Sequence, residues 1–221
     1  MSLDKISLTL YDLIGYLLPG YIVVAAFSII EANFSQTNVF HLSRISQDAF
    51  TFAVLAYILG SAAHALGSWA VKKWPSNRRD PLAPEIERSA KKVAQSIFDI
   101  PYNSITSNEL YLLADSYIVA NGGSVERDII TAREGFFKAA MASLSILSIA
   151  LVASLLSEAR VQISSKVYIE IDRIGLVFII VLVLLLAYIF RSRYTFFNCI
   201  KRNNAIRLFL AIRQKNMSKP T

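Results

Sequence analysis

The chain has 221 residues, 54% of which are hydrophobic, and its 23 lysine and arginine residues outnumber its 16 acidic residues to give a formal net charge of +7. Soluble domains are roughly 45–50% apolar, so this composition excludes an ordinary soluble globular protein. The single cysteine, Cys199, excludes an intramolecular disulfide bond.

Four apolar segments are long enough to cross a bilayer. They cover residues 10–30, 49–71, 136–157 and 174–190. A bilayer core is about 30 Å thick, and a helix needs roughly 20 mostly apolar residues to cross it. The sequence therefore predicts an all-α membrane protein with four transmembrane helices and a small helical cytosolic insert between spans two and three. Its expected segments are an N-terminal transmembrane hairpin (1–71), the insert (72–135), a C-terminal transmembrane hairpin (136–190) and a basic cytosolic tail (191–221).

The first span contains a proline–glycine pair and an ionisable residue. Proline in a helix interior removes a hydrogen bond and kinks the helix, so we expect a bend, a break or a re-entrant-like start at Pro19 and Gly20. Asp12 lies near the cytoplasmic end of this span. Ionisable residues inside membranes are candidates for function, although a carboxylate so close to the headgroups also suits helix capping or contact with water. Because the apolar run is interrupted, we expect a retained helix and not a cleaved signal peptide.

The second span carries four small residues at helical spacing. They are Ala56, Gly60, Ala63 and Gly67. Because residues three and four apart share one face of a helix, this face predicts close packing of helix backbones in lipid. His64 lies beside it and either senses pH or donates a proton, or simply hydrogen-bonds a neighbouring helix. Asp12 and His64 are the candidate intramembrane polar sites, and antiparallel first and second spans would place them at similar depth.

The insert begins with the signals of two short helices. Asp80-Pro81 predicts the first start, and Pro101 ends that helix. Thr106 and Glu109 form a predicted capping box at the second start, and Gly122-Gly123 supplies its stop.

A third helix begins at Ser124 and meets no strong breaker before span three ends near Ser157. At 1.5 Å per residue, this predicts one helix of about 50 Å that runs from the insert into the membrane. Span three is rich in small and hydroxyl residues, which either pack against span two or line a water-filled path. Serine hydroxyls can bond back to their own helix, which favours packing. Span four is mostly aliphatic and is expected to face lipid, and the preceding loop predicts a small hairpin around Ser164-Ser165.

The distribution of basic residues predicts the orientation. Four spans place both termini on one side, and 19 of the 23 lysine and arginine residues then lie on that side. The positive-inside rule assigns this side to the cytoplasm, so we expect a multipass protein with both termini inside. Four aromatic residues fit this orientation because they fall at the cytoplasmic headgroups: Trp69, Trp74, Tyr188 and Tyr194.

The tail from 191 to 221 holds eight basic side chains and no acidic one. Such a tail is attracted to anionic lipid by about 1 kcal/mol per basic residue near the surface. The apolar residues among these charges suit an interfacial helix, which favours lipid over nucleic acid as the partner. The simpler alternative is a stop-transfer signal. The expected headgroup contacts are made by Arg191, Arg193, Lys201, Arg202 and Arg207.

The sequence lacks the motifs of catalytic and cofactor sites. His41 and His64 lie on opposite sides of the membrane in this topology, and one cysteine cannot complete a zinc cluster. There is no phosphate-binding glycine loop and no G-x-S-x-G nucleophile elbow. We therefore expect a non-enzymatic protein with no catalytic residue, no cofactor and no metal.

The segment 11–20 reads Tyr-Asp-Leu-Ile-Gly-Tyr-Leu-Leu-Pro-Gly. It resembles the first helix of small uncharacterised bacterial four-span membrane proteins, some of which are found in anti-phage defence or CRISPR-accessory neighbourhoods. The resemblance covers these ten residues and the general layout of four spans with a helical insert. It implies an effector of antiviral defence in the bacterial inner (plasma) membrane that perturbs the host envelope, and it carries over no functional residue.

Two functions fit these features. The first is a self-associating membrane protein that perturbs the membrane or forms a pore, which would require a homo-oligomer because four helices alone pack solid. The second is a membrane-anchored scaffold or accessory subunit whose insert and tail recruit a cytosolic protein partner. A small transporter would be expected to show inverted repeats, and the two hairpins have no convincing similarity.

Overall fold

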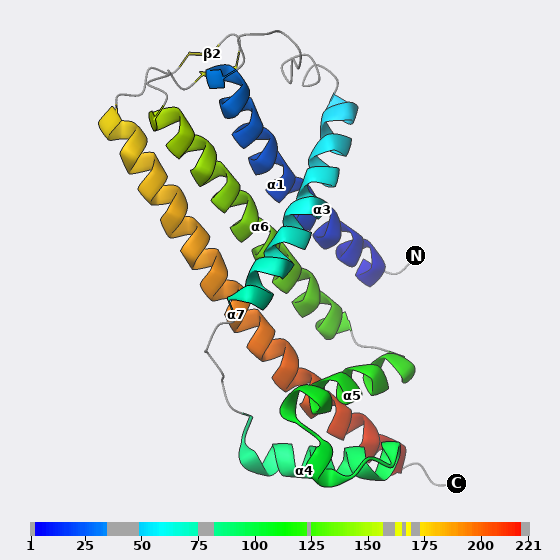
Figure 1. The fold of residues 1–221 in the computed structure, drawn as a ribbon. Coiled ribbons are helices and arrows are strands. Elements are labelled where there is room, and N and C mark those ends of the chain that lie inside the picture. Colours follow the sequence, from blue (N-terminus) through cyan, green and yellow to red (C-terminus); the bar gives the residue numbers. More distant parts are fainter. Residues whose placement is uncertain are drawn as a thin grey trace. The chain divides into compact units, whose positions relative to one another are not determined.

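The computed structural model describes residues 3–34, 49–74, 82–122, 125–156, 162–164, 167–168 and 173–217. Its helices are α1 (Leu3–Phe34), α3 (Ala49–Lys73), α4 (Pro84–Phe98), α5 (Ser107–Ala120), α6 (Val125–Leu156) and α7 (Arg173–Met217), with a 3-10 turn η1 (Tyr102–Ser104) (Figure 1). The chain divides into two compact units. The bundle unit consists of Met1–Ser76 and Ala132–Tyr194, and the insert–tail unit consists of Asn77–Thr131 and Thr195–Thr221.

The four predicted spans are all helical in the structure. Helices α1, α3, α6 and α7 are each long and apolar enough to cross a membrane. The prediction of one long helix from the insert through span three is confirmed, because α6 runs without interruption for 32 residues. Helix α7 is longer than expected, since it continues from span four through the tail for 45 residues and meets no proline or glycine after Gly175.

Helix α1 passes through the proline–glycine pair. The expected break or re-entrant-like start is wrong, because α1 is one helix with Pro19 inside it, while the alternative of a bend stays a prediction. Pro19 is fully buried, and Gly20 lies against the backbone carbonyl of Ala56 on α3. Packing against α3 therefore keeps this segment helical even though proline removes one hydrogen bond.

The small-residue face of α3 is used for packing within the chain. The buried residues of α3 are Ala56, Gly60, Ala63 and Gly67, the four that share the predicted face. A Cβ on Gly60 would overlap the carbonyl of Tyr16 on α1, and a Cβ on Gly67 would overlap the carbonyl of Lys138 on α6. Helix α3 therefore approaches both neighbours at backbone distance, which small residues permit.

Helices α1 and α6 supply most of the interior of the bundle unit. One apolar cluster joins α1, α6 and α7 and consists of Ala26, Ile29, Leu144, Ala150, Leu151, Leu176, Ile180, Val183 and Ala187.

In this unit the four helices alternate in direction (Figure 1), as helices joined in an up-and-down bundle do. Many large residues of span four remain exposed, such as Phe178 and Tyr188, each 69% exposed, which fits a helix that faces lipid.

Two buried serines of α6 bond back to their own helix, whereas the buried hydroxyl of Ser143 has no hydrogen-bond partner among the described residues. The hydroxyl of Ser148 donates to the carbonyl of Leu144 at 2.8 Å, and that of Ser154 donates to the carbonyl of Ala150 at 3.1 Å. Both serines are buried. These contacts favour the packing interpretation over a water-filled path, while Ser157 lies outside the described residues.

The predicted hairpin before span four is present. Strand β1 (Gln162–Ser164) pairs antiparallel with β2 (Val167–Tyr168). Ser165 lies outside the described residues.

In the insert–tail unit, the first helix begins later than predicted. Helix α4 starts at Pro84 with Ala83 as its N-cap, whereas Asp80-Pro81 lies outside the described residues. Pro84 suits the first turn because its missing N–H would have no helical partner there. Two acidic residues in that turn complement the positive end of the helix dipole.

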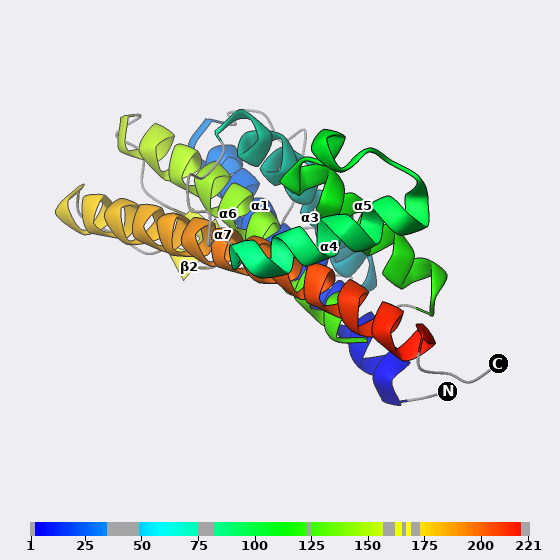
Figure 2. The same cartoon turned by 90° about the horizontal axis from the view of Figure 1, so that it is seen from below.

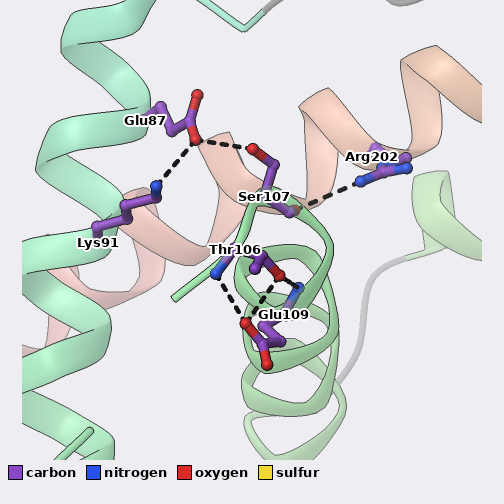
Figure 3. A network of polar contacts seen from close by, with 6 residues as sticks. All are labelled: Glu87, Lys91, Thr106, Ser107, Glu109 and Arg202. Atoms are coloured by element: carbon purple, nitrogen blue, oxygen red, sulfur yellow. Dashed lines mark hydrogen bonds and ion pairs between the residues drawn. The ribbon is translucent and has the colours of Figure 1, made fainter. Parts of the chain in front are cut away.

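The capping box at the start of α5 is confirmed (Figure 3). The N–H of Thr106 donates to Oε2 of Glu109 at 2.7 Å, and the N–H of Glu109 donates to Oγ1 of Thr106 at 3.2 Å. Oγ of Ser107 also donates to Oε1 of Glu87 on α4 at 2.9 Å. These bonds satisfy the first N–H groups of α5 and connect α5 to α4.

The tail forms part of the core of the insert–tail unit. Figures 1 and 2 both show α4 and α5 beside the C-terminal part of α7. Ile206 and Phe209 of α7 are buried with Ala90 of α4 and Leu110 of α5, and the rings of Phe209 and Tyr117 meet edge to face at 5.2 Å. The expected interfacial helix is therefore wrong for these apolar residues, because they contact protein.

Candidate functional site

The bundle unit contains a buried ion pair on α6. Nζ of Lys138 lies 3.4 Å from Oε1 of Glu134, one helical turn earlier. Glu134 is only 7% exposed. A buried charge is costly unless it is paired, and ionisable residues inside a membrane bundle are candidates for function. This pair is therefore the starting point of the site.

His64 of α3 lies next to this pair. Its Nε2 would be 3.4 Å from a Cβ on Gly135, an ordinary van der Waals distance, so the imidazole lies against α6 at this residue. Gly135 directly follows Glu134 on α6, so the imidazole lies near the ion pair. On another side, the rings of His64 and Tyr16 of α1 are 5.7 Å apart in an edge-to-face arrangement.

Tyr194 of α7 completes the site. Nζ of Lys138 lies 5.4 Å from the centre of its ring, within the range of a cation–π interaction. Tyr194 is 6% exposed, so its side chain packs inside the bundle unit, while its depth at the headgroups stays a prediction. We define the Glu134 cluster as Tyr16, His64, Glu134, Lys138 and Tyr194. Its carboxylate, imidazole and ammonium groups can hold and exchange protons.

The sequence pointed to His64 as a candidate polar site of this cluster, and to Tyr194 only as an aromatic residue at the headgroups. Asp12 lies on α1 one turn before Tyr16, but its side chain is not described, so a pair with His64 stays a prediction. Glu134 was missed because the predicted third span begins two residues later, at residue 136, whereas Lys138 lies inside that span and was not considered as a partner for it. A glutamate four residues before a lysine, at the edge of an apolar run, was the available signal.

Two of the residues with predicted headgroup contacts also donate hydrogen bonds to the protein, and their contacts with lipid stay a prediction. Nη2 of Arg191 donates to the carbonyl of Trp74 at 3.2 Å within the bundle unit. Nη2 of Arg202 donates to the carbonyl of Ser107 at 3.4 Å (Figure 3), and its guanidinium lies 5.6 Å from the ring centre of Tyr111. Arg202 therefore helps to hold α5 against α7 in the insert–tail unit.

The other three predicted headgroup residues have different surroundings. Arg193 and Arg207 are exposed on α7, as contact with an external anion requires. Lys201 lines a cavity of the insert–tail unit. Arg207 lines the same cavity from an exposed position.

A bidentate ion pair joins α5 to the first turn of α6. Nε and Nη2 of Arg127 lie 2.5 and 2.7 Å from the two carboxylate oxygens of Asp115. These hydrogen bonds from Arg127 hold the pKa of Asp115 below its usual range, with a smaller contribution from the charge of Lys201. A carboxyl whose folded-state pKa is depressed stabilises the fold above its ordinary pKa, about 3.9, and loses this contribution as pH falls through the folded-state value.

We therefore expect the insert–tail unit to lose stability in acid through Asp115. The substitution Asp115→Asn should cost roughly 1 kcal/mol at neutral pH, because the pair is partly exposed, and should reduce the further loss below about pH 4. Hydrogen exchange of α5 amides, corrected for intrinsic rates, measures the stability cost at neutral pH and the further loss of stability in acid. Asp128→Asn is the matched control, since Asp128 makes one 3.0 Å contact with the same arginine and is 43% exposed. Equal effects of the two substitutions would contradict this account.

Among the side chains that the structure describes, no three His, Cys, Asp or Glu residues are placed to hold a metal ion. No family profile matches the chain. Comparison with curated proteins and with solved structures finds no similar protein.

Proposed function

We propose that the chain is a non-enzymatic, membrane-anchored scaffold or accessory subunit whose insert–tail unit recruits a cytosolic protein partner. The supporting observation is that apolar residues of the tail are buried in the core of the insert–tail unit. Phe209 is 0% exposed and lies in one cluster with buried residues of α4 and α5. A stop-transfer signal needs only charge, whereas a folded unit offers a shaped surface for another protein.

The same proposal places both termini in the cytoplasm of a bacterial inner membrane. The end of α3 supports this orientation because it carries Lys72 and Lys73 beside two tryptophans. Trp69 and Trp74 are each 56% exposed, and Nζ of Lys73 lies 5.2 and 5.9 Å from their ring centres. Aromatic and basic residues gather in this way at the cytoplasmic interface of membrane helices.

The exposed face of α5 is the surface that we assign to the partner. Leu112 and Val119 are 53% and 56% exposed. They are seven residues apart, so they lie on one face of α5. Apolar residues at this spacing are the anchors that helical protein contacts use.

A photo-crosslinking residue at position 119 tests this proposal in cells. We expect an adduct between the chain and a protein of different mass. The matched control is the same residue at Val181, which is 58% exposed on α7 and faces lipid in the proposed orientation, so it should give no protein adduct. The absence of any protein adduct at position 119 would show that the proposed surface is wrong.

Self-association into a membrane-perturbing or pore-forming assembly is the competing proposal. The Glu134 cluster favours it, because ionisable groups within membrane bundles often mark paths for ions or protons. The small-residue face of α3 does not support it, because this face packs against α1 and α6 within the chain. An adduct of twice the chain mass from position 181 would favour self-association over the scaffold.

A further inference from the structure

The insert–tail unit contains a cavity that the proposed partner surface does not use. It has a volume of about 280 Å³ and lies between the start of α6 and the tail part of α7. Its polar lining includes Arg127, Lys201, Asn204 and Arg207, while Ile130 and Leu208 contribute apolar surface. The lining of the cavity therefore contains both basic and apolar side chains.

The charge of this cavity is suited to an anion. Three of its described lining residues are basic and none is acidic. The nearby carboxylates Asp115 and Asp128 pair with Arg127 and orient its guanidinium. Lys201 and Arg207 add positive charge from the other wall. The described side chains that line the cavity are therefore basic or uncharged.

The size of the cavity limits the ligand. Small-molecule sites usually have volumes of roughly 300–1,000 Å³, so this cavity is at the small end of that range. It has room for one anionic group and a small apolar part but not for a protein helix, whose diameter with side chains is about 10 Å. A phosphate carries up to two negative charges and accepts several hydrogen bonds, so it gains more than a carboxylate from several cations and an amide.

We propose that this cavity binds a small phosphate-bearing ligand. Lys201 and Arg207 contact the phosphate, the amide of Asn204 donates a hydrogen bond to it, and Ile130 and Leu208 cover the apolar part of the ligand. The phosphate belongs either to a soluble nucleotide-like molecule or to the headgroup of an anionic lipid. This site does not depend on recruitment of a protein partner.

Hydrogen exchange of the full chain in nanodiscs tests this assignment. In phosphatidylcholine discs, the probes are inorganic phosphate and adenosine monophosphate. In a second arm, discs of phosphatidylglycerol replace the soluble probes. We expect slower exchange at residues 201–211 of α7 in at least one arm. Protection by adenosine monophosphate identifies a soluble ligand, and protection only in phosphatidylglycerol identifies a lipid headgroup.

Two substitutions separate the cavity from the general charge of the tail. Arg207→Gln removes a lining cation from an exposed position and should weaken the response about tenfold, as expected for one charge-assisted hydrogen bond. Arg213→Gln is the control, because Arg213 lies on α7 but is not part of the lining. Equal weakening by both substitutions, or no protection in either arm, would overturn the proposal.

Discussion

Replacing Gly60 by alanine will destabilise the bundle unit. The new Cβ would overlap the backbone carbonyl of Tyr16 on α1, and a backbone atom cannot move aside as a flexible side chain can. Overpacking usually costs about 1–3 kcal/mol and occasionally more, and we expect the upper end of this range. The free energy of unfolding in bicelles, measured by steric trapping of a tagged pair on α1 and α3, gives the value.

Gly15→Ala is the matched control for this substitution. Gly15 is also a buried helical glycine of the bundle unit, but a Cβ there would have no atom within 4 Å. Because alanine is favoured over glycine in a helix by up to about 1 kcal/mol, this variant should be neutral or more stable. Similar destabilisation by both variants would mean that α1 and α3 do not approach as closely at Gly60 as the structure indicates.

Replacing Phe209 by alanine will loosen the insert–tail unit. Phe209 is 0% exposed and contacts Tyr117 of α5, so its removal leaves a cavity at the centre of this core. Phe→Ala substitutions in cores cost about 3–5 kcal/mol, which is a large fraction of the stability of a small unit. We expect faster hydrogen exchange throughout α4 and α5, measured by mass spectrometry on the full chain.

Phe196→Ala provides the comparison within the same helix. Phe196 is 48% exposed, so its removal creates no closed cavity and should change exchange in α4 and α5 little. If Phe209→Ala also left the exchange of these helices unchanged, the insert would fold without the tail. The scaffold proposal would then lose its supporting observation.

The spans and helix signals were predictable because they depend on local sequence. Apolar length indicates the four spanning helices, the spacing from Ala56 to Gly67 indicates one packing face, and the Thr106–Glu109 pair indicates a cap. Each pattern lies within one helix. The structure has a helix at each of the four apolar segments, buries the small-residue face of α3 and contains the capping box.

Other features depend on contacts between distant segments. Ile206 and Phe209 have the spacing of an interfacial helix and of a core-facing helix alike, and only the position of α4 and α5 distinguishes the two. The rule that proline breaks helices did not predict α1, because it omits the neighbouring helix against which Gly20 packs. His64 was visible in the sequence, whereas its position between Tyr16 of α1 and Gly135 of α6 depends on three different helices.

The pairing of the two tryptophans at the end of α3 has a spectroscopic consequence. The chain has only two tryptophans, and their ring centres are 6.0 Å apart at an interplanar angle of 83°. All indole fluorescence therefore arises from one place on the molecule. Quenching by lipids brominated at known depths would report how far this single point lies from the bilayer centre. The tryptophan pair is therefore an intrinsic fluorescent probe of membrane depth that needs no added label.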